Sequence, residues 1–373
     1  MAEALRLARK GLYTTDPNPR VGCVIADGAQ VSGRGWHAAA GGPHAEIAAL
    51  QDAALRRPGA SLRGQTAYVT LEPCSHHGRT PPCADALVAA GIARVVIACA
   101  DPNPRVNGGG VARLRAAGVE VQCGLMAEAA AALNCGFLMR MQAGRPWVRV
   151  KSAISLDGRT ALRSGESRWI SGEPSRRDVQ HWRARSSAIL TGIGTVLADD
   201  PRLDARLEDI VEAAVDGKVL QPLRVVADSR WRTPPGSRLL QDPARTLLAG
   251  DRDRPVPAAL QALGARCLPL PARDGHVDLE ALLRALAELE INEVQVEAGA
   301  RLCGALLGAG LVDELLVYQA PVLLGDGGPG LAALGPLESM AERMHLEVLE
   351  TTRFGDDLRI RLKPPSTRGL AEG

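Results

Sequence analysis

Residues 72–83 read Glu-Pro-Cys-Ser-His-His-Gly-Arg-Thr-Pro-Pro-Cys, and residues 44–46 upstream read His-Ala-Glu. Zinc binds imidazole nitrogen and thiolate sulfur, and a catalytic zinc site keeps its fourth position for water. His44, Cys74 and Cys83 supply three ligands of these kinds and leave that position open. The pattern therefore predicts a catalytic zinc site in a domain that brings the two segments together.

Glu46 follows His44 by two residues, at the start of an expected helix, where it can carry protons without binding the metal. Bound zinc lowers the pKa of water toward neutrality, and Glu46 would pass the released proton to a departing amino group. H-x-E followed by P-C-x-x-C is the signature of zinc nucleobase deaminases. Here eight residues rather than two separate the cysteines, so residues 75–82 would have to loop out between two ligands.

Two other interpretations of these residues stay open. A structural zinc site needs four protein ligands, so His76 or His77 would have to be the fourth, and Glu46 would then have no role. The cysteines could also never meet in the fold. In the catalytic interpretation, His76 and His77 are loop residues that could contact a substrate phosphate.

The composition is typical of a globular protein with two domains. The 373 residues exceed one ordinary core, and 46% hydrophobic and 23% charged residues are near globular averages. A net charge of +2 argues against a nucleic-acid partner, and eight cysteines are too few for a disulfide scaffold. No apolar run could span a bilayer, and the amphipathic start lacks a signal peptide. We expect a cytoplasmic homo-oligomer that acts on a small molecule.

Strands and helices are expected to alternate along the whole chain, which indicates α/β architecture. Gly144-Arg145-Pro146 resembles a linker, so we expect domains at residues 1–144 and 145–373. The patterns predict strands at 21–25, 67–71, 95–98, 119–123, 147–151, 188–190, 223–227, 246–249, 293–297 and 314–317. They predict helices at 3–12, 44–56, 84–90, 111–117, 279–289 and 303–307.

Several segments together resemble the bacterial riboflavin-biosynthesis deaminase/reductase family. In the first half these are residues 73–83, Pro17-Asn18-Pro19-Arg20-Val21-Gly22 and Asp101-Pro102-Asn103-Pro104. In the second half they are Ser155-Leu156-Asp157-Gly158-Arg159, Trp169-Ile170, residues 195–201 and Val296-Glu297-Ala298-Gly299. They occur in the order expected for that family.

The resemblance implies a cytidine-deaminase-like α/β/α sandwich followed by a dihydrofolate-reductase-like α/β domain. It implies Zn²⁺ and NADPH as cofactors. The implied reactions are deamination of 2,5-diamino-6-(5-phosphoribosylamino)pyrimidin-4-one and reduction of its ribosyl group to ribityl, giving 5-amino-6-(5-phosphoribitylamino)uracil. A zinc-dependent hydrolase is thus expected in the first domain and an NADPH-dependent oxidoreductase in the second.

The resemblance also assigns roles to individual residues. Cofactor contact is expected for Ala153, Trp169, Thr195, Asp199, Ser229, Gly299, Ala300, Arg301, Leu302, Cys303, Gly304 and Ala305. A turn at residues 299–305 that opens a helix suits the pyrophosphate, because helix N-termini bind phosphate. Substrate contact is expected for Asn18, Ser167, Arg183, Leu203, Arg206 and Glu297, and the two arginines could bind the ribose phosphate.

Simpler interpretations compete with these roles. Trp169 could be core, Asp199 a helix cap, Gly299 a turn and Asn18 ordinary turn chemistry before proline. Gly192-Ile193-Gly194 follows a strand, but Leu197 stands where the dinucleotide fingerprint needs its third glycine. For the whole protein, the rivals are a nucleic-acid editing deaminase, which would need a basic, aromatic-rich groove, and a non-catalytic scaffold. The intact His-Glu-Cys-Cys set argues against a scaffold.

Overall fold

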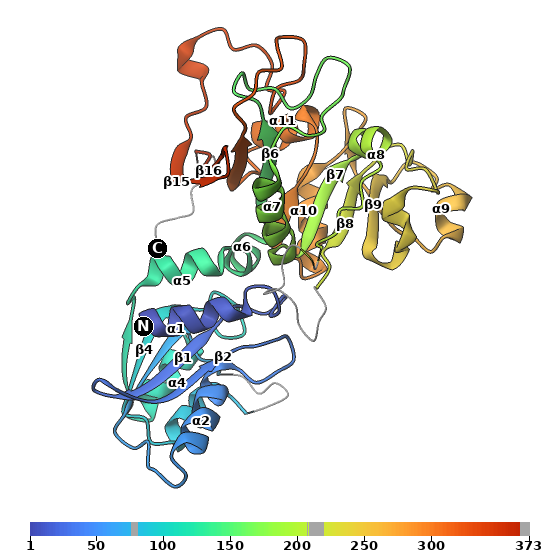
Figure 1. Cartoon of the computed structure of the whole chain (residues 1–373). Helices are drawn as coiled ribbons and strands as arrows, with labels where there is room; N and C mark the ends of the chain where they lie inside the picture. The colour runs from blue at the N-terminus through green and yellow to red at the C-terminus, as the bar shows by residue number, and fades with distance from the viewer. Residues whose placement is uncertain (76–80, 207, 209–219, 366–373) are drawn as a thin grey trace. The chain divides into compact units, whose positions relative to one another are not determined.

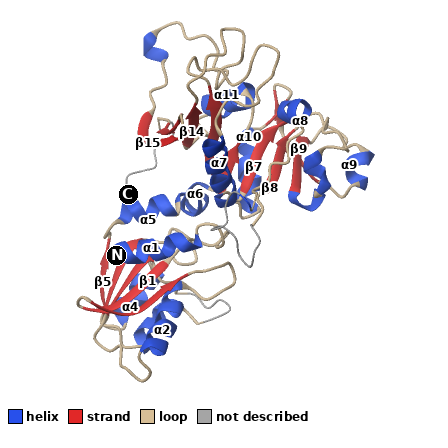
Figure 2. Ribbon diagram, viewed as in Figure 1, coloured by secondary structure: helices blue, strands red, loops and turns tan. Residues whose placement is uncertain are grey.

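The computed structural model describes residues 1–75, 81–206, 208 and 220–365. The chain separates into two compact units, Met1–Arg145 and Pro146–Gly373, and strands alternate with helices in each (Figures 1 and 2). Among the described residues, no helix combines the length and the apolar character needed to cross a bilayer.

Five strands form the sheet within the described part of Met1–Arg145, in the order β2-β1-β3-β4-β5. Their bounds are β1 Gly22–Asp27, β2 Gln30–Trp36, β3 Thr66–Leu71, β4 Arg94–Cys99 and β5 Glu120–Cys123. β1 runs antiparallel to β2 and β3, whereas β3, β4 and β5 are parallel. Gly28, with φ at 55°, makes the tight β1–β2 turn, a left-handed conformation that glycine adopts without steric cost.

Helices cover both faces of this sheet. They are α1 Ala2–Ala8, α2 Ala45–Arg56, α3 Cys83–Ala89, α4 Gly109–Ala116, α5 Ala127–Leu133 and α6 Cys135–Ala143, with a 3-10 turn at Arg9–Gly11. Ile25 and Ile97 pack on one face with Leu87 of α3 and Leu114 of α4. On the other face, α1 packs on Val24, and α1 and α5 pack on Ala98. The expected α/β/α sandwich is confirmed.

The described part of Pro146–Gly373 holds a nine-stranded sheet in the order β10-β9-β8-β7-β13-β6-β14-β16-β15. The strands are β6 Trp147–Ile154, β7 Ala188–Gly192, β8 Leu223–Ala227, β9 Thr246–Asp251, β10 Arg266–Leu270, β13 Glu293–Val296, β14 Glu314–Gln319, β15 Glu347–Phe354 and β16 Asp357–Lys363. Neighbours are parallel except where β16 pairs with β14 and β15. β11 Ala272–Arg273 and β12 His276–Val277 form a small separate hairpin.

The helices of this unit lie on opposite faces of its sheet. They are α7 Glu173–Arg185, α8 Ile193–Asp199, α9 Ala258–Ala262, α10 Leu279–Glu288 and α11 Ala300–Gly308, with 3-10 turns at Arg238–Gln241, Pro243–Arg245 and Met340–Glu342. Val148 and Val294 belong to the large apolar core that α10 and α11 complete. Leu316 and Tyr318 face the other way, against Val179 and Trp182 of α7.

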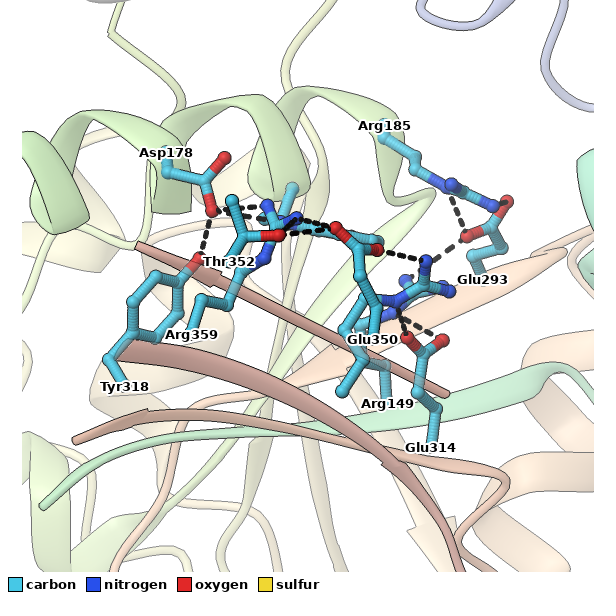
Figure 3. Close-up of polar contacts among 11 residues, drawn as sticks. Arg149, Asp178, Arg185, Glu293, Glu314, Tyr318, Glu350, Thr352 and Arg359 are labelled. Carbon is cyan, nitrogen blue, oxygen red and sulfur yellow. Dashed lines mark hydrogen bonds and ion pairs between the residues drawn. The ribbon is translucent and has the colours of Figure 1, made fainter. Parts of the chain in front are cut away.

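The face beneath α7 carries a buried layer of ion pairs, drawn in Figure 3. Arg149, which is fully buried, has Nε 2.9 Å from Glu314 and Nη1 3.2 Å from Glu293. The same layer continues through other side chains, in the pairs Arg185–Glu293, Arg361–Glu314, Arg361–Glu350, Arg359–Glu350, Arg359–Asp178 and Tyr318–Asp178. The Trp182 ring lies 4.5 Å from the Arg149 guanidinium. These contacts fix α7 on the sheet.

Every strand and helix predicted above has a counterpart in the structure, with ends shifted by a few residues. The helix predicted at 303–307, for example, begins earlier, at Ala300. The sequence patterns missed α5, α6, α7, α8, α9, β10, β11, β12, β15 and β16. α7 was missed because its sequence is strongly polar. The sheet face that this helix covers is charged, so the buried side of the helix does not show the apolar residues that reveal a helical period.

Candidate active sites

Three candidate zinc ligands converge where β3 and two helices meet. His44 immediately precedes α2, Cys74 lies after β3, and Cys83 is the first residue of α3. His44 Nδ1 lies 3.7 Å from Cys74 Sγ and 3.3 Å from Cys83 Sγ. The three ligand atoms are all within 4.8 Å of one another. The long separation of the two cysteines in the sequence therefore does not keep them apart.

The donor set fits a tetrahedral zinc ion. Zinc lies about 2.0 Å from imidazole nitrogen and about 2.3 Å from thiolate sulfur, so tetrahedral ligands stand roughly 3.5–3.8 Å apart. The two His44–sulfur distances are close to that range. The Cys83 N–H donates to Cys74 Sγ at 3.3 Å. Hydrogen bonding from Cys83, supported by His44, lowers the pKa of the Cys74 thiol to about 4, which favours the thiolate that binds metal.

Glu46 lies in the first turn of α2 and is only 3% exposed. Burial raises the pKa of this carboxyl to about 7, so it can both accept and release a proton near neutral pH. Its position depends on close packing of α2 on β2. A Cβ on Gly35 would stand 2.3 Å from the Ala45 carbonyl oxygen, so only glycine permits this approach.

Asn18 is held by a histidine that the sequence patterns did not single out. His37 Nδ1 donates to the Pro43 carbonyl oxygen at 2.9 Å, so the neutral ring accepts at Nε2 from Asn18 Nδ2, 3.0 Å away. Burial lowers the pKa of His37 and favours this neutral form. The His37 and His44 rings meet edge to face, with centroids 5.6 Å apart. Asn18 is therefore fixed close to the expected metal site.

Two other segments of the first unit were singled out in the sequence, residues 101–105 and the pair His76 and His77. The Asp101–Arg105 segment is a turn, because Asp101 Oδ1 accepts from the Asn103 N–H at 2.9 Å. Glu72 braces it, since its carboxylate accepts from the N–H groups of Asp101, Gly108 and Val111. His76 and His77, predicted as loop residues, lie outside the described residues.

The second unit contains a cavity of about 1280 Å³ along the carboxyl ends of β8, β7 and β13. The predicted cofactor and substrate residues that line it are Ala153, Ser167, Trp169, Thr195, Asp199, Ser229, Glu297, Gly299, Ala300, Arg301, Leu302, Gly304 and Ala305. Trp169 is 71% exposed, so the interpretation of this side chain as core is wrong. Gly299 is the residue before α11, so residues 299–305 do open a helix.

Four predicted residues lie outside the lining of this cavity. Cys303 is buried in the apolar core, and its thiol donates to the Ala298 carbonyl oxygen. Leu203 is also buried, at 3% exposure. Arg206 is exposed, and its backbone N–H donates to Gln180. Arg183 is paired with Glu297, which lines the cavity. Roles in ligand contact for these four stay predictions.

Arg183 and Glu297 form a two-point ion pair at the cavity wall. Nε and Nη2 of Arg183 each lie 2.7 Å from a carboxylate oxygen, and Nη1 donates to the Asp204 carbonyl oxygen at 2.9 Å. Gln295 donates to the same carboxylate at 2.7 Å. Burial alone would raise the pKa of Glu297, but Arg183 and, less strongly, Lys151 lower it to about 2. Glu297 is therefore an ionised, rigidly held carboxylate.

Comparisons with known proteins identify the family of both units. The model of the RibD C-terminal domain matches residues 146–360, and that of the cytidine and deoxycytidylate deaminase zinc-binding region matches residues 1–99. The riboflavin biosynthesis protein RibD of Escherichia coli K12 is 49% identical over 97% of this chain and 98% of its own. This chain belongs to the RibD family. The Haemophilus influenzae RibD is 44% identical over 98% of this chain and 96% of its own.

Solved RibD structures share the fold. An Acinetobacter baumannii RibD superposes with a TM-score of 0.88 at 45% identity, with 97% of each chain covered. A Thermotoga maritima protein superposes with a TM-score of 0.84 at 33% identity, over 98% of this chain and 97% of its own. The latter is described as a diaminohydroxyphosphoribosylaminopyrimidine deaminase/5-amino-6-(5-phosphoribosylamino)uracil reductase. The family resemblance and the fold class predicted from the sequence are confirmed.

Several residues of this RibD chain escaped the sequence patterns. His37, Lys151, Gln295 and Arg230 sit in no short motif, and all four lie at the sites described above. Lys151 and Gln295 could have been found from the sequence pattern of their strands. Each is a polar residue two positions from another polar residue within an expected buried strand, which places both on one face.

Proposed function

We propose that this chain catalyses two consecutive steps of riboflavin biosynthesis. The first unit deaminates 2,5-diamino-6-(5-phosphoribosylamino)pyrimidin-4-one, and the second reduces the ribosyl group to ribityl with NADPH. The product is 5-amino-6-(5-phosphoribitylamino)uracil. The observation that carries the proposal is the convergence of His44, Cys74 and Cys83 within 4.8 Å, next to the buried carboxyl of Glu46.

In the deaminase unit, His44, Cys74 and Cys83 would hold zinc. When bound, zinc supplies an acidified water that can attack the pyrimidine carbon. Glu46 takes the proton from that water and delivers it to the departing amino group, and a pKa of about 7 suits both transfers. Asn18 already gives an amide N–H to His37, so its carbonyl oxygen is the group left to accept from a pyrimidine N–H.

In the reductase unit, bound NADPH would supply a hydride for C1′ of the ribosyl group. Ala153, Trp169, Thr195, Asp199, Ser229 and residues 299–305 contact the cofactor. Ser167, Leu203, Arg206 and Glu297 contact the substrate. Arg183 has three of its N–H groups committed to Glu297 and Asp204, which supports a role in orienting the carboxylate, and Arg206 is the better partner for the ribose phosphate.

One coupled assay tests the proposal. Purified protein with measured zinc content is given the diaminopyrimidine phosphate and NADPH, while released ammonia and oxidised NADPH are followed together. We expect ammonia to appear first, and NADPH oxidation to depend on zinc with this substrate but not with the deaminated intermediate. Zinc-replete protein that releases no ammonia, or that oxidises no NADPH on the intermediate, would refute the assignment.

We propose further that the enzyme works in the cytoplasm as a homo-oligomer, without a nucleic-acid partner. Thiolate ligands need a reducing compartment, and a net charge of +2 lacks the basic excess of nucleic-acid-binding domains. Light scattering coupled to gel filtration measures the mass of the assembly. A monomer at micromolar concentration, or tRNA binding with a steep salt dependence, would contradict these expectations.

A further inference from the structure

The carboxylate of Glu297 is held by donors from two separate elements. Its Oε1 accepts from Arg183 Nε of α7 and from Gln295 Nε2 of β13, both at 2.7 Å. Its Oε2 accepts from Arg183 Nη2, also at 2.7 Å. An ionised carboxylate has about two acceptor positions on each oxygen. Oε1 is therefore saturated by these two donors, and the position left for a bound molecule belongs to Oε2.

The backbone of Glu297 is fixed independently of these side-chain contacts. Its N–H donates to the Leu190 carbonyl oxygen at 2.9 Å, and its own carbonyl oxygen accepts from the Thr191 hydroxyl at 2.7 Å. Both partners belong to β7, the strand next to β13. Because the main chain is attached to β7, what remains to be fixed is the rotation of the Glu297 side chain, and Arg183 and Gln295 set it.

The amide of Gln295 is oriented by an anion and a cation. Gln295 is fully buried, and side chains alternate along β13, so it shares a face with Glu293 and Glu297. Its partner in register on β6 is the buried cation Arg149. Exchanging the amide nitrogen and oxygen would place the carbonyl against the Glu297 carboxylate. The amide dipole therefore keeps its NH₂ group toward Glu297 and its carbonyl toward the positive side of the layer.

Two polar atoms on the β6–β13 ladder complement each other. Among the residues that the structure describes, Gln295 Oε1 and Arg149 Nη2 are both buried and make no hydrogen bond. One is an acceptor and the other a donor, and their residues are paired in register on neighbouring strands. Buried polar atoms are hydrogen-bonded in the great majority of cases. Gln295 is thus placed to connect the Arg149 ion pairs with Glu297.

We propose that Gln295 is a positioning residue of the reductase, which saturates Oε1 of Glu297 and leaves Oε2 as the oxygen that meets the substrate. This inference rests on the proposed reductase function, in which Glu297 contacts the substrate. Without this donor, each oxygen would offer one acceptor position, and the substrate would bind in two ways, one of them misaligned. Misplacement of a contacting group slows the chemical step.

Gln295→Met tests this role, because methionine has a similar size and no donor. Steady-state reduction of the deaminated intermediate gives kcat and KM, and fluorescence titration gives the Kd of NADPH. Thr246→Val is the matched control, since it removes a fully buried hydroxyl that donates to the Leu239 carbonyl oxygen outside the cavity lining. We expect kcat of Gln295→Met to fall by about 10–100-fold, the cost of a hydrogen bond to a charged group. NADPH affinity and ammonia release should change less than about twofold.

Gln295→Glu supplies a readout that a merely structural role would not move. Two carboxyl groups in contact resist ionising together, so one of them keeps a proton well above the ordinary carboxyl pKa. The shared proton restores a donor to Glu297, whereas at higher pH the two carboxylates repel each other. The other titratable groups that act on Glu297 are Arg183 of α7, Lys151 of β6 and Tyr318 of β14, and these variants retain all three.

The rate of Gln295→Glu relative to the wild type should therefore rise about tenfold between about pH 8.5 and 6, while that of Gln295→Met stays flat. If Gln295→Met fails to fold, this pH response decides the question alone. Wild-type kcat in Gln295→Met, or a flat response in Gln295→Glu, would overturn this inference and leave the reductase function intact. An equal fall of kcat in Thr246→Val would also overturn it. A wild type that oxidises no NADPH on the intermediate would instead overturn the reductase function.

Discussion

Removing Arg183 would test how the reductase site is held together. Arg183→Met takes away a cation that contacts both carboxylate oxygens of Glu297 at 2.7 Å, where the two side chains are only 16% and 13% exposed. Glu297 would keep Gln295 and Lys151 as polar neighbours. Breaking a buried ion pair by removing one partner costs about 3–5 kcal/mol.

The pKa of Glu297 gives a second measure of the same interaction. Burial raises this pKa, but Arg183, with smaller contributions from Lys151 and Gln295, lowers it from 4.5 to about 2. One pKa unit corresponds to about 1.4 kcal/mol, so the ionised Glu297 carboxylate, in an environment of Arg183, Lys151 and Gln295, contributes about 3 kcal/mol of folding free energy. Because the folded-state pKa lies below the unfolded value, this stabilisation is complete above about pH 4.5 and is lost as the pH falls toward 2. Arg183 is the strongest of these partners, so Arg183→Met should cost about 3 kcal/mol at pH 7, the lower end of the range for a broken buried pair.

Urea unfolding followed by tryptophan fluorescence measures this loss. Four of the five tryptophans lie in the second unit, so the signal reports mainly on that unit. Arg177→Met is the matched control on α7, because Arg177 pairs with Glu173 where both side chains are more than 60% exposed, and such surface pairs contribute about 0–1 kcal/mol. Arg183→Met/Glu297→Gln should recover part of the loss. If Arg183→Met were as stable as Arg177→Met, the reasoning would be refuted.

Other changes separate the two sites. Glu46→Gln should lower ammonia release by about 10²–10⁴-fold, because it removes the proton carrier of the deaminase unit. NADPH oxidation on the deaminated intermediate should persist. Loss of both rates in folded protein would count against separate sites. Cys83→Ser should abolish stoichiometric zinc, measured by atomic emission, because only two strong ligands remain. Gly304→Ala should weaken NADPH binding in a fluorescence titration, because its Cβ would stand 2.2 Å from the Ala333 carbonyl oxygen and displace α11; unchanged affinity would exclude a role for α11.

The first site could be located from the sequence because its metal ligands lie in short sequence motifs. Zinc restricts its ligands to a few residue types, so His44, Cys74 and Cys83 could be selected before any fold was known. The β-strands were found for a related reason. Central strands of a parallel sheet are apolar runs bounded by turns, and such runs are visible without knowing their neighbours.

The residues of the second site could be assigned only by resemblance to the family. The contacts among these residues could not be predicted from the sequence. Cys303 illustrates the difference. It lies within the segment expected to cradle the pyrophosphate, yet as the fourth residue of α11 its side chain faces the core. The role of Arg183 depends on an ion pair with Glu297, 114 positions away, and no local pattern encodes that contact.

The buried ion-pair layer explains both why α7 was missed and how the reductase site is built. Side chains alternate along a strand, so Arg149 and Lys151 of β6 share the face that carries Glu293, Gln295 and then Glu297. Along this face, polar side chains run from the paired layer to the cavity. Burial of these charges is possible because most of them form ion pairs; Arg149, for example, pairs with both Glu293 and Glu314. The α7 helix that covers this layer also carries Arg183, which pairs with Glu297. The helix whose polar sequence concealed it from sequence analysis therefore also fixes the position of the Glu297 carboxylate.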